Sequence, residues 1–252
     1  MRWSSKRRSH YPTYVREVAE VLKSKYRNFA HYNLEDPFEE LLFIVLSTKT
    51  TESSYRASFQ ALKNAFPKRD DLIGVPAERI ASVIAKGGLS SKKSEVIRIL
   101  VDEISNRFSS LTLDPLKKMS ENEAEEFLLS LPGIGKKTAR CVMMYSLKAK
   151  VFPVDTHCWR IARRLGWIRP TQKDKRCGPR DMDRLQEKIP PDLRFSLHVN
   201  MVSLGREICL ASAPKCGFCP VLEWCPRIGV NKKEKRDSWK LKEKNVYLFN
   251  KL

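Results

Sequence analysis

The sequence has 252 residues, 42% of them hydrophobic, and carries 48 lysines and arginines against 29 acids, a formal net charge of +19. A chain of this length can bury a hydrophobic core, and it has no apolar run long enough to cross a bilayer. Its basic start is not followed by the apolar core of a signal peptide, so we expect an intracellular protein with no membrane partner. The basic excess extends through residues 30–228, which indicates a polyanion such as nucleic acid as partner.

The first half of the chain predicts helices. Asp36 is a candidate N-cap, and Pro37 a first helical residue, for the apolar run Phe38–Leu46. Apolar residues recur at three- and four-residue steps over residues 55–66 and 96–108, which is the spacing of one helix face.

The second half continues in the same way. Ser120 and Glu123 are spaced as a capping box, and a further helix is expected over residues 193–210. The polar residues 168–180 are expected to form an exposed loop. We find no convincing strand pair and no internal repeat, so the predicted class is all-α.

A hairpin is predicted within the segment Leu-Pro-Gly-Ile-Gly-Lys-Lys-Thr-Ala-Arg. Pro132 ends the preceding helix, and Gly133 and Gly135 permit a tight turn into a helix that begins near Lys136. Exposed N–H groups at such a helix start favour a phosphate. Most Gly-x-Gly turns are plain connectors, but Lys136 and Lys137 favour an anion-binding role here.

The next motif is Val-Asp-Thr-His, which contains Asp155. An aspartate there is expected to cap the following helix, a common structural role. Lys137 and Asp155 are 18 residues apart and bracket one helix and its return loop. We therefore expect both side chains at the mouth of one site.

Together, the hairpin and the Val-Asp-Thr-His motif resemble the helix-hairpin-helix, Gly/Pro-rich, aspartate signature of the endonuclease III superfamily of DNA glycosylases. The resemblance covers about residues 36–226. It implies a base-excision repair DNA glycosylase with AP lyase activity. In its register Lys137 is the catalytic lysine and Asp155 the catalytic aspartate, while Lys136 contacts phosphate.

The implied chemistry suits these residue types. A lysine amine can attack C1′ of a nucleotide as the base departs and form a Schiff base with the opened sugar. Lys136 and Arg140 are expected to lower the affinity of Lys137 for its proton. Asp155 is expected to stabilise the positive charge that develops on the sugar.

Four cysteines follow with the spacing C-x6-C-x2-C-x5-C: Cys209, Cys216, Cys219 and Cys225. Four soft thiolates this close in sequence can enclose one metal centre, and structural zinc is an alternative on spacing alone. The family resemblance implies a four-iron–four-sulfur (4Fe-4S) cluster. Its loop is expected to offer Lys215 and backbone N–H groups to DNA phosphate.

The resemblance also implies two loops that enter DNA when a base is extruded. Lys49 stands where relatives usually have a glutamine that plugs the gap. Leu89 is a candidate apolar wedge, with ordinary core packing as the alternative, and Lys92 or Lys93 is expected to contact phosphate. The substrate is a damaged or mismatched base in double-stranded DNA. A pyrimidine is the family default, and the lysine at position 49 leaves the opposite-base preference open.

We expect two helical domains flanking a DNA-binding cleft. Residues 30–149 would form a helical barrel with the hairpin, and residues 1–29 and 150–228 the iron–sulfur domain. Residues 229–252 would be a basic extension. The protein is expected to be a monomer whose DNA binding depends steeply on salt.

Three alternatives remain at this point. One is a monofunctional glycosylase in which Asp155 activates water, and another is a helix-hairpin-helix module that binds DNA without cleaving it. A redox sensor centred on the cluster is the third. We assign no catalytic role to His157, expect Cys141 and Cys158 to be packing residues, and leave Cys177 unassigned.

Overall fold

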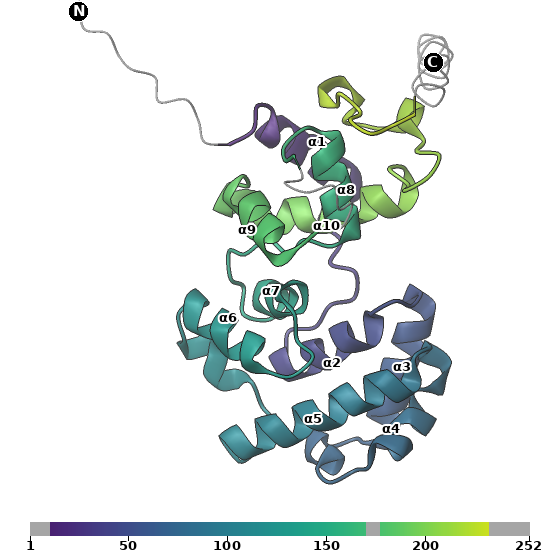
Figure 1. Ribbon diagram of the computed structural model, residues 1–252, viewed down its shortest axis with the longest axis vertical. Helices are drawn as coiled ribbons and strands as arrows, with labels where there is room; N and C mark the ends of the chain where they lie inside the picture. The colour runs from purple at the N-terminus through teal and green to yellow at the C-terminus, as the bar shows by residue number, and fades with distance from the viewer. Residues whose placement is uncertain (1–10, 170–176, 232–252) are drawn as a thin grey trace, which may run out of the picture. The chain divides into compact units, whose positions relative to one another are not determined.

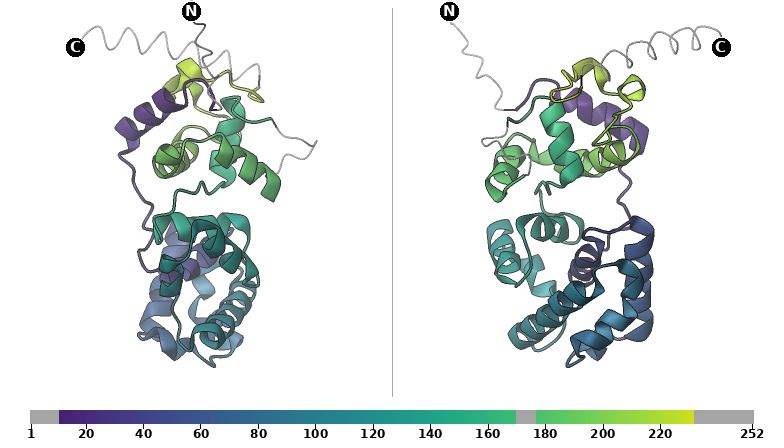
Figure 2. Two further views of the ribbon diagram at one scale, coloured as in Figure 1. Left: turned by 90° about the vertical axis from the view of Figure 1, so that its left-hand side faces the viewer. Right: turned by 45° about the vertical axis from the view of Figure 1, so that its right-hand side comes forward.

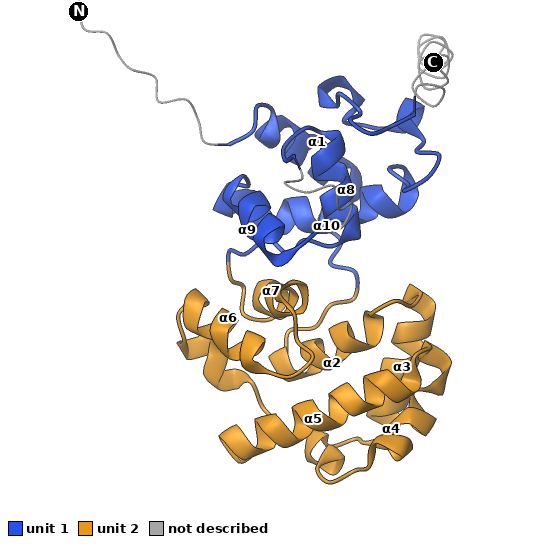
Figure 3. Ribbon diagram, in the orientation of Figure 1, with its two compact units in different colours: residues 1–31, 150–252 blue, residues 32–149 orange. Residues whose placement is uncertain are grey.

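The computed structural model describes residues 11–169 and 177–231. These residues form helices joined by loops and short 3-10 turns and include no strand (Figures 1 and 2), which confirms the predicted all-α class. The chain divides into two compact units, residues 32–149 and residues 1–31 with 150–252 (Figure 3). None of the described helices is both long enough and apolar enough to cross a lipid bilayer.

The unit of residues 32–149 is built around a central helix, α2, which buries nearly all of its residues. A largely apolar surface suits a helix that has neighbours on several sides, and α3, α5 and α7 pack against α2. The α-helices of this unit are α2 Pro37–Ser47, α3 Glu52–Ala65, α4 Ala77–Val83, α5 Ser90–Phe108, α6 Glu121–Ser130 and α7 Lys136–Tyr145. Its 3-10 turns are Arg69–Leu72, Ala85–Gly87 and Asp114–Lys118.

Local hydrogen bonds explain where these helices begin. The Asp36 carboxylate accepts the N–H groups of Phe38 and Glu39 at 3.0 and 2.9 Å, which confirms it as the N-cap of α2. At α6 the Ser120 hydroxyl accepts the Glu123 N–H, while the Glu123 carboxylate accepts the Ser120 N–H at 2.8 Å. The predicted capping box is therefore confirmed.

The second unit joins residues from both ends of the chain. Its α-helices are α1 Val15–Tyr26, α8 Thr156–Arg164, α9 Pro179–Glu187 and α10 Arg194–Glu207. Its 3-10 turns are Pro191–Leu193, Cys216–Phe218 and Leu222–Trp224. Helix α10 packs on α1 and α8, and the fully buried Leu22, Phe152 and Leu197 belong to their shared core.

The prediction of an exposed loop over residues 168–180 is wrong at both ends of this range. Ile168 is buried, and Pro179 is the first residue of α9; residues 170–176 lie outside the described part of the chain. Past Pro226 the chain is still packed, because the Ile228 N–H donates to the Arg164 carbonyl at 3.2 Å and Val230 is buried. Of the expected basic extension, residues 232–252 lie outside the described residues.

Candidate functional site

The hairpin between α6 and α7 has the tight turn that the sequence predicts. Gly133 has φ of 79°, in the left-handed region that side chains disfavour. A Cβ at Gly133 would also lie 3.2 Å from Val96 Cγ1. The Ile134 N–H donates to the Leu131 carbonyl at 3.2 Å, and both of these side chains are buried. Gly133 is therefore required by the fold itself.

Gly135 differs from Gly133. It precedes α7 with φ of −98°, which any residue adopts, and a Cβ there would meet nothing within 4 Å. The residue is exposed. Neither backbone strain nor internal packing accounts for a glycine at this position.

Lys136 and Lys137 occupy the first turn of α7, and both are half-buried. Arg140, one turn later, is buried and its Nε donates to the Glu125 carboxylate of α6 at 2.7 Å. Glu125 therefore balances the charge of Arg140. The expectation that Lys136 and Arg140 lower the proton affinity of Lys137 stays a prediction.

Glu40 is an acidic residue near this hairpin that we did not identify from the sequence. Its side chain on α2 is fully buried, and its carboxylate accepts hydrogen bonds from the Asn33 side chain and from the Leu34 N–H. Burial raises the pKa of Glu40 to about 7, while the charges of Lys137 and Lys148 act in the opposite direction. The available signal was an acid inside the apolar run of α2.

In the other unit, Asp155 is the N-cap of α8, as predicted. Its carboxylate accepts the Cys158 N–H at 2.7 Å, and the positive end of the helix dipole favours a negative charge there. The side chain is half-buried.

The structure gives His157 a packing role. A Cβ at Gly205 of α10 would lie 2.4 Å from His157 Nδ1, so the imidazole ring packs directly on that glycine. Arg160 lies 3.1 Å from the same nitrogen and also donates to the Gly205 carbonyl at 3.0 Å. Burial lowers the pKa of His157. These contacts explain its position without a catalytic role.

The two loops predicted to enter DNA belong to the unit of residues 32–149. Lys49 and Leu89 are both exposed, and both have φ of 52°, an uncommon conformation for residues other than glycine. Leu89 is 48% exposed, so the alternative that it is an ordinary core residue is wrong.

The sequence offered either Lys92 or Lys93 for a phosphate contact, and the two lysines differ in exposure in the structure. Lys92 is exposed, whereas Lys93 is buried and its ammonium group donates to the Leu46 and Gly87 carbonyls. Burial lowers the pKa of Lys93. The expectation of a phosphate contact is therefore wrong for Lys93 and remains a prediction for Lys92.

Two of the four spaced cysteines, Cys209 and Cys225, contact Arg164 at the end of α8. Arg164 donates to Cys209 Sγ at 3.1 Å, and the Arg164 carbonyl accepts from Cys225 Sγ at 3.4 Å. Burial raises the pKa of Cys219 to about 12 and that of Cys225 to about 11, and the neighbouring sulfurs act in the same direction. The four sulfurs are therefore close enough to interact electrostatically, and none is in a disulfide.

Among the described residues, no group of three or more His, Cys, Asp or Glu side chains is arranged to hold a single metal ion. The four cysteines nevertheless fit a thiolate-bound cluster that contains more than one metal ion, because all four ligands are sulfurs. Arg164, which donates to Cys209 Sγ, can balance part of the negative charge of such a cluster. The other cysteines behave as follows: Cys141 and Cys158 are buried, which confirms them as packing residues, and Cys177 is half-buried.

The loop before Cys216 presents the Lys215 side chain to solvent. Its backbone is less available than expected, because the N–H groups of Leu210 and Lys215 both donate to the Ile208 carbonyl at 2.9 Å. These two N–H groups cannot serve a phosphate while those bonds are in place, so any contact from Lys215 would be through its ammonium group.

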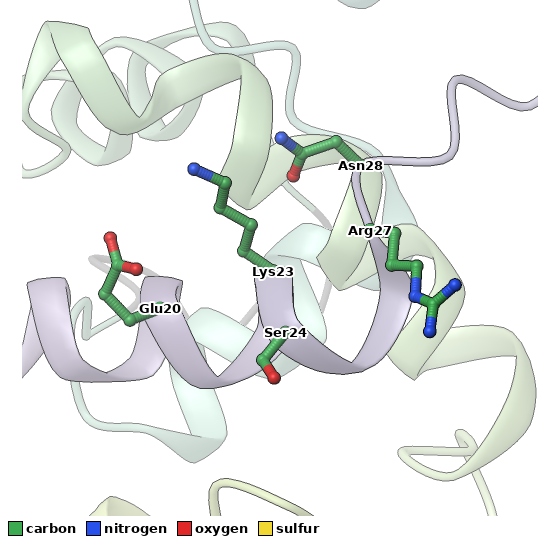
Figure 4. Close-up of a pocket in the computed structure, with 5 residues that line it drawn as sticks. All are labelled: Glu20, Lys23, Ser24, Arg27 and Asn28. Atoms are coloured by element: carbon green, nitrogen blue, oxygen red, sulfur yellow. The ribbon is translucent and has the colours of Figure 1, made fainter.

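A surface pocket of about 440 Å³ lies on α1 and is lined by Glu20, Lys23, Ser24, Arg27 and Asn28 (Figure 4). It contains none of the residues that the sequence singles out. We assign it no part in the candidate site.

Comparisons with known proteins agree with these features. The sequence profile described as HhH-GPD superfamily base excision DNA repair protein matches residues 43–186. A protein of Arabidopsis thaliana named as a DNA glycosylase is 36% identical over 172 residues, and these cover 68% of this chain but only 57% of that protein. Endonuclease III of Thermotoga maritima is 30% identical over 216 residues, covering 84% of this chain and 92% of that protein.

A solved structure described as a trapped endonuclease III–DNA covalent intermediate in an estranged-adenine complex has a similar fold. Its TM-score is 0.71 and its identity 25%, over 84% of this chain and 94% of that chain. The profile covers more than half of the chain, and the endonuclease III relative matches nearly all of its own length. The chain therefore belongs to the HhH-GPD superfamily of base excision DNA repair proteins and is endonuclease III-like.

Proposed function

We propose that the chain is a DNA glycosylase with AP lyase activity. Its substrate would be double-stranded DNA containing a damaged or mismatched base, with a pyrimidine as the preferred class. The observation that carries the proposal is the hairpin that places Lys137 in the first turn of α7. The similarity to a structure described as a covalent endonuclease III–DNA intermediate supports a covalent mechanism.

Lys137 is the proposed nucleophile. Its Nζ forms a bond to C1′ while the bond from C1′ to the base breaks, and the base leaves with a proton. The sugar ring opens and the linkage becomes a Schiff base. Loss of a proton from C2′ then breaks the bond from C3′ to the 3′ phosphate oxygen, and water releases Lys137.

Asp155 would stabilise the positive charge on the sugar as the base departs. Its carboxylate is already oriented by the bond from the Cys158 N–H. A carboxylate held in advance needs no reorganisation during the reaction, which is where electrostatic catalysis derives its strength.

The hairpin is the proposed phosphate-binding element, with Gly133, Gly135 and Lys136. Gly135 supports this best, because an approaching backbone phosphate would explain a glycine that the fold does not require. In the other unit, Lys215 is exposed and suited to a further phosphate contact.

Lys49 and Leu89 would occupy the gap left by the extruded nucleotide. Both are exposed side chains in strained loops, and strain of this kind is often found at functional sites. Their chemistry suits a polar contact to the estranged base and an apolar wedge, respectively.

The four cysteines Cys209, Cys216, Cys219 and Cys225 would hold a 4Fe-4S cluster. When bound, the cluster would act as a structural centre that orders the loop carrying Lys215. Arg164 would support it by binding Cys209 Sγ and the carbonyls of Leu210 and Ala211 at 2.7 and 3.0 Å. We propose a monomer as the active form.

The test is to incubate the protein with duplexes that each bear one lesion or one abasic site, and to add borohydride. A Schiff base with Lys137 would be reduced to a stable covalent adduct, visible on a denaturing gel. Lys137→Gln should abolish the adduct, and Lys136→Gln should weaken DNA binding while retaining the adduct.

No adduct with any duplex, despite DNA binding by a folded protein, would contradict the lyase proposal. Release of free base without an adduct would then identify a monofunctional glycosylase, and no release would identify a binding module.

A further inference from the structure

We propose that Lys93 is a positioning residue, whose buried ammonium group holds together the two loops that carry Lys49 and Leu89. The inference rests on the proposed function of these loops in filling the gap in DNA. It assigns a role to a lysine that touches no DNA itself.

The contacts of Lys93 link two segments that are distant in sequence. Its Nζ donates to the Leu46 carbonyl at 2.6 Å and to the Gly87 carbonyl at 3.0 Å, and the residue is 5% exposed. Leu46 lies in the last turn of α2, three residues before Lys49. Gly87 ends the 3-10 turn Ala85–Gly87, two residues before Leu89.

Both carbonyls lie at the end of a helical segment, where C=O groups lack a partner within the helix. At the end of α2, the Ser47 hydroxyl donates to the Ile44 carbonyl and the Thr48 N–H to the Val45 carbonyl. Lys93 satisfies the Leu46 carbonyl. Its positive charge also faces the negative end of the α2 dipole.

The described residues contain no ion pair between Lys93 and a carboxylate. A buried ammonium without an acidic partner is costly to retain, so the two carbonyls supply its stabilisation. If either loop moves away, the buried ammonium group of Lys93 loses one of its two carbonyl acceptors. The free energy lost in this way couples the positions of the two loops.

One of the two loops is also anchored independently. Gly87 packs so closely on α3 that a Cβ there would lie 2.4 Å from Ser58 Oγ. The same Ser58 hydroxyl donates to the Ile84 carbonyl at 3.2 Å. Lys93 therefore connects the end of α2 to a segment that α3 already holds in place.

The loops need such a connection, because Lys49 and Leu89 each have φ of 52°. A residue stays in this disfavoured region only when the surrounding structure holds it there. Two side chains that enter one gap must also keep a fixed separation, and small displacements in such a constellation greatly reduce rates.

The variant that tests the proposal is Lys93→Met, which keeps the length of the side chain and removes its donors. Lys118→Met is the matched control, because Lys118 is an exposed lysine of the same unit. Circular dichroism and thermal unfolding establish that both variants fold. Lys93→Arg tests rescue, because a guanidinium can still donate to two carbonyls.

Entry of the two loops into DNA is measured on a duplex that has 2-aminopurine opposite a tetrahydrofuran abasic analogue. This analogue cannot form a Schiff base, so the assay does not depend on base excision or strand cleavage. Entry of the loops unstacks the 2-aminopurine and raises its fluorescence. The rise should be full with wild type and Lys118→Met, reduced with Leu89→Ala and Lys93→Met, and partly restored with Lys93→Arg.

Excision and lyase chemistry are measured alongside. Lys93→Met should slow single-turnover excision of a damaged base about tenfold or more, while borohydride trapping at a ready-made abasic site is largely retained. In the Leu89→Ala/Lys93→Met double variant excision should be no slower than in the slower single variant, because Lys93 acts through the loop.

An unchanged fluorescence rise and excision rate in Lys93→Met would overturn the proposal. So would an equal loss of excision and of trapping at the abasic site, because general damage to the fold would explain it. If wild type forms no adduct at all but the fluorescence pattern holds, the lyase proposal fails and the role of Lys93 stands.

Discussion

Glu40 and Lys93 are two charged side chains that the fold buries in the same unit, with different partners. Lys93 donates to two carbonyl oxygens, which stabilise its positive charge. Glu40 accepts two hydrogen bonds, yet burial still raises its pKa to about 7. The two donors to Glu40 therefore do not fully replace the water it has lost.

The raised pKa of Glu40 predicts how stability depends on pH. The carboxyl group releases its proton near its ordinary value of 4.5 in the unfolded chain and near 7 in the folded protein. Between these values the folded state binds more protons, so the free energy of unfolding falls as pH rises through this window. The contribution of Glu40 to this fall is about 3 kcal/mol in total.

Glu40→Gln should remove this contribution. In urea unfolding at pH 5 and pH 7.5 the variant should lose less stability over the interval than wild type. Glu35→Gln, at an exposed position, is the control and should follow wild type. The same fall in wild type and Glu40→Gln would show that Glu40 titrates normally in the folded protein.

At the scale of elements, the hairpin contains two glycines, and the physical reason for having glycine differs between the two positions. Gly133 combines a left-handed backbone with a close approach to Val96, whereas Gly135 has neither constraint. The fold explains the first glycine, and the proposed phosphate explains the second.

Alanine at each position separates folding from DNA binding. Gly133→Ala should lower the free energy of unfolding by about 1–2 kcal/mol or more, from left-handed strain and contact with Val96. Gly135→Ala should cost less than about 1 kcal/mol but weaken binding to a duplex with a tetrahydrofuran site. Urea unfolding and fluorescence anisotropy measure the two effects. Wild-type affinity in Gly135→Ala would argue against close approach of a phosphate to the hairpin.

At the scale of the whole molecule, a formal net charge of +19 suits a chain that binds DNA. The candidate groups are distributed over both units. Lys137, Lys49 and Leu89 belong to residues 32–149, whereas Asp155, Lys215 and the four cysteines belong to residues 150–252. Each unit therefore supplies part of the proposed chemistry.

The metal content tests the proposed cluster. Wild type purified without air should contain about four irons and four acid-labile sulfides per chain. Cys216→Ser should lose most of both and bind DNA more weakly, because the loop with Lys215 loses its centre. Cys177→Ser, outside the set of four, should retain the iron. One zinc per chain and no labile sulfide would identify a structural zinc site instead.

Much of the local structure could be predicted from the sequence. The Asp36 and Asp155 caps, the Ser120 capping box and the left-handed Gly133 depend on residues a few positions apart. Their hydrogen bonds and backbone preferences act within one turn, so the sequence contains them directly. The helices α1, α4 and α9 were not predicted. Helices α4 and α9 have only seven and nine residues, and such short helices depend on packing for their stability.

By itself the sequence determined the all-α class, the family signature and the candidate roles of Lys137, Asp155 and the cysteines, which stay predictions until tested. Only the tertiary structure decided that Lys93 is buried beside an exposed Lys92, that Leu89 is exposed and that Glu125 pairs with Arg140. The physical reason is that burial and charge pairing depend on contacts between segments distant in sequence. Lys93 reaches Leu46 across 47 positions, and no local pattern records such a contact.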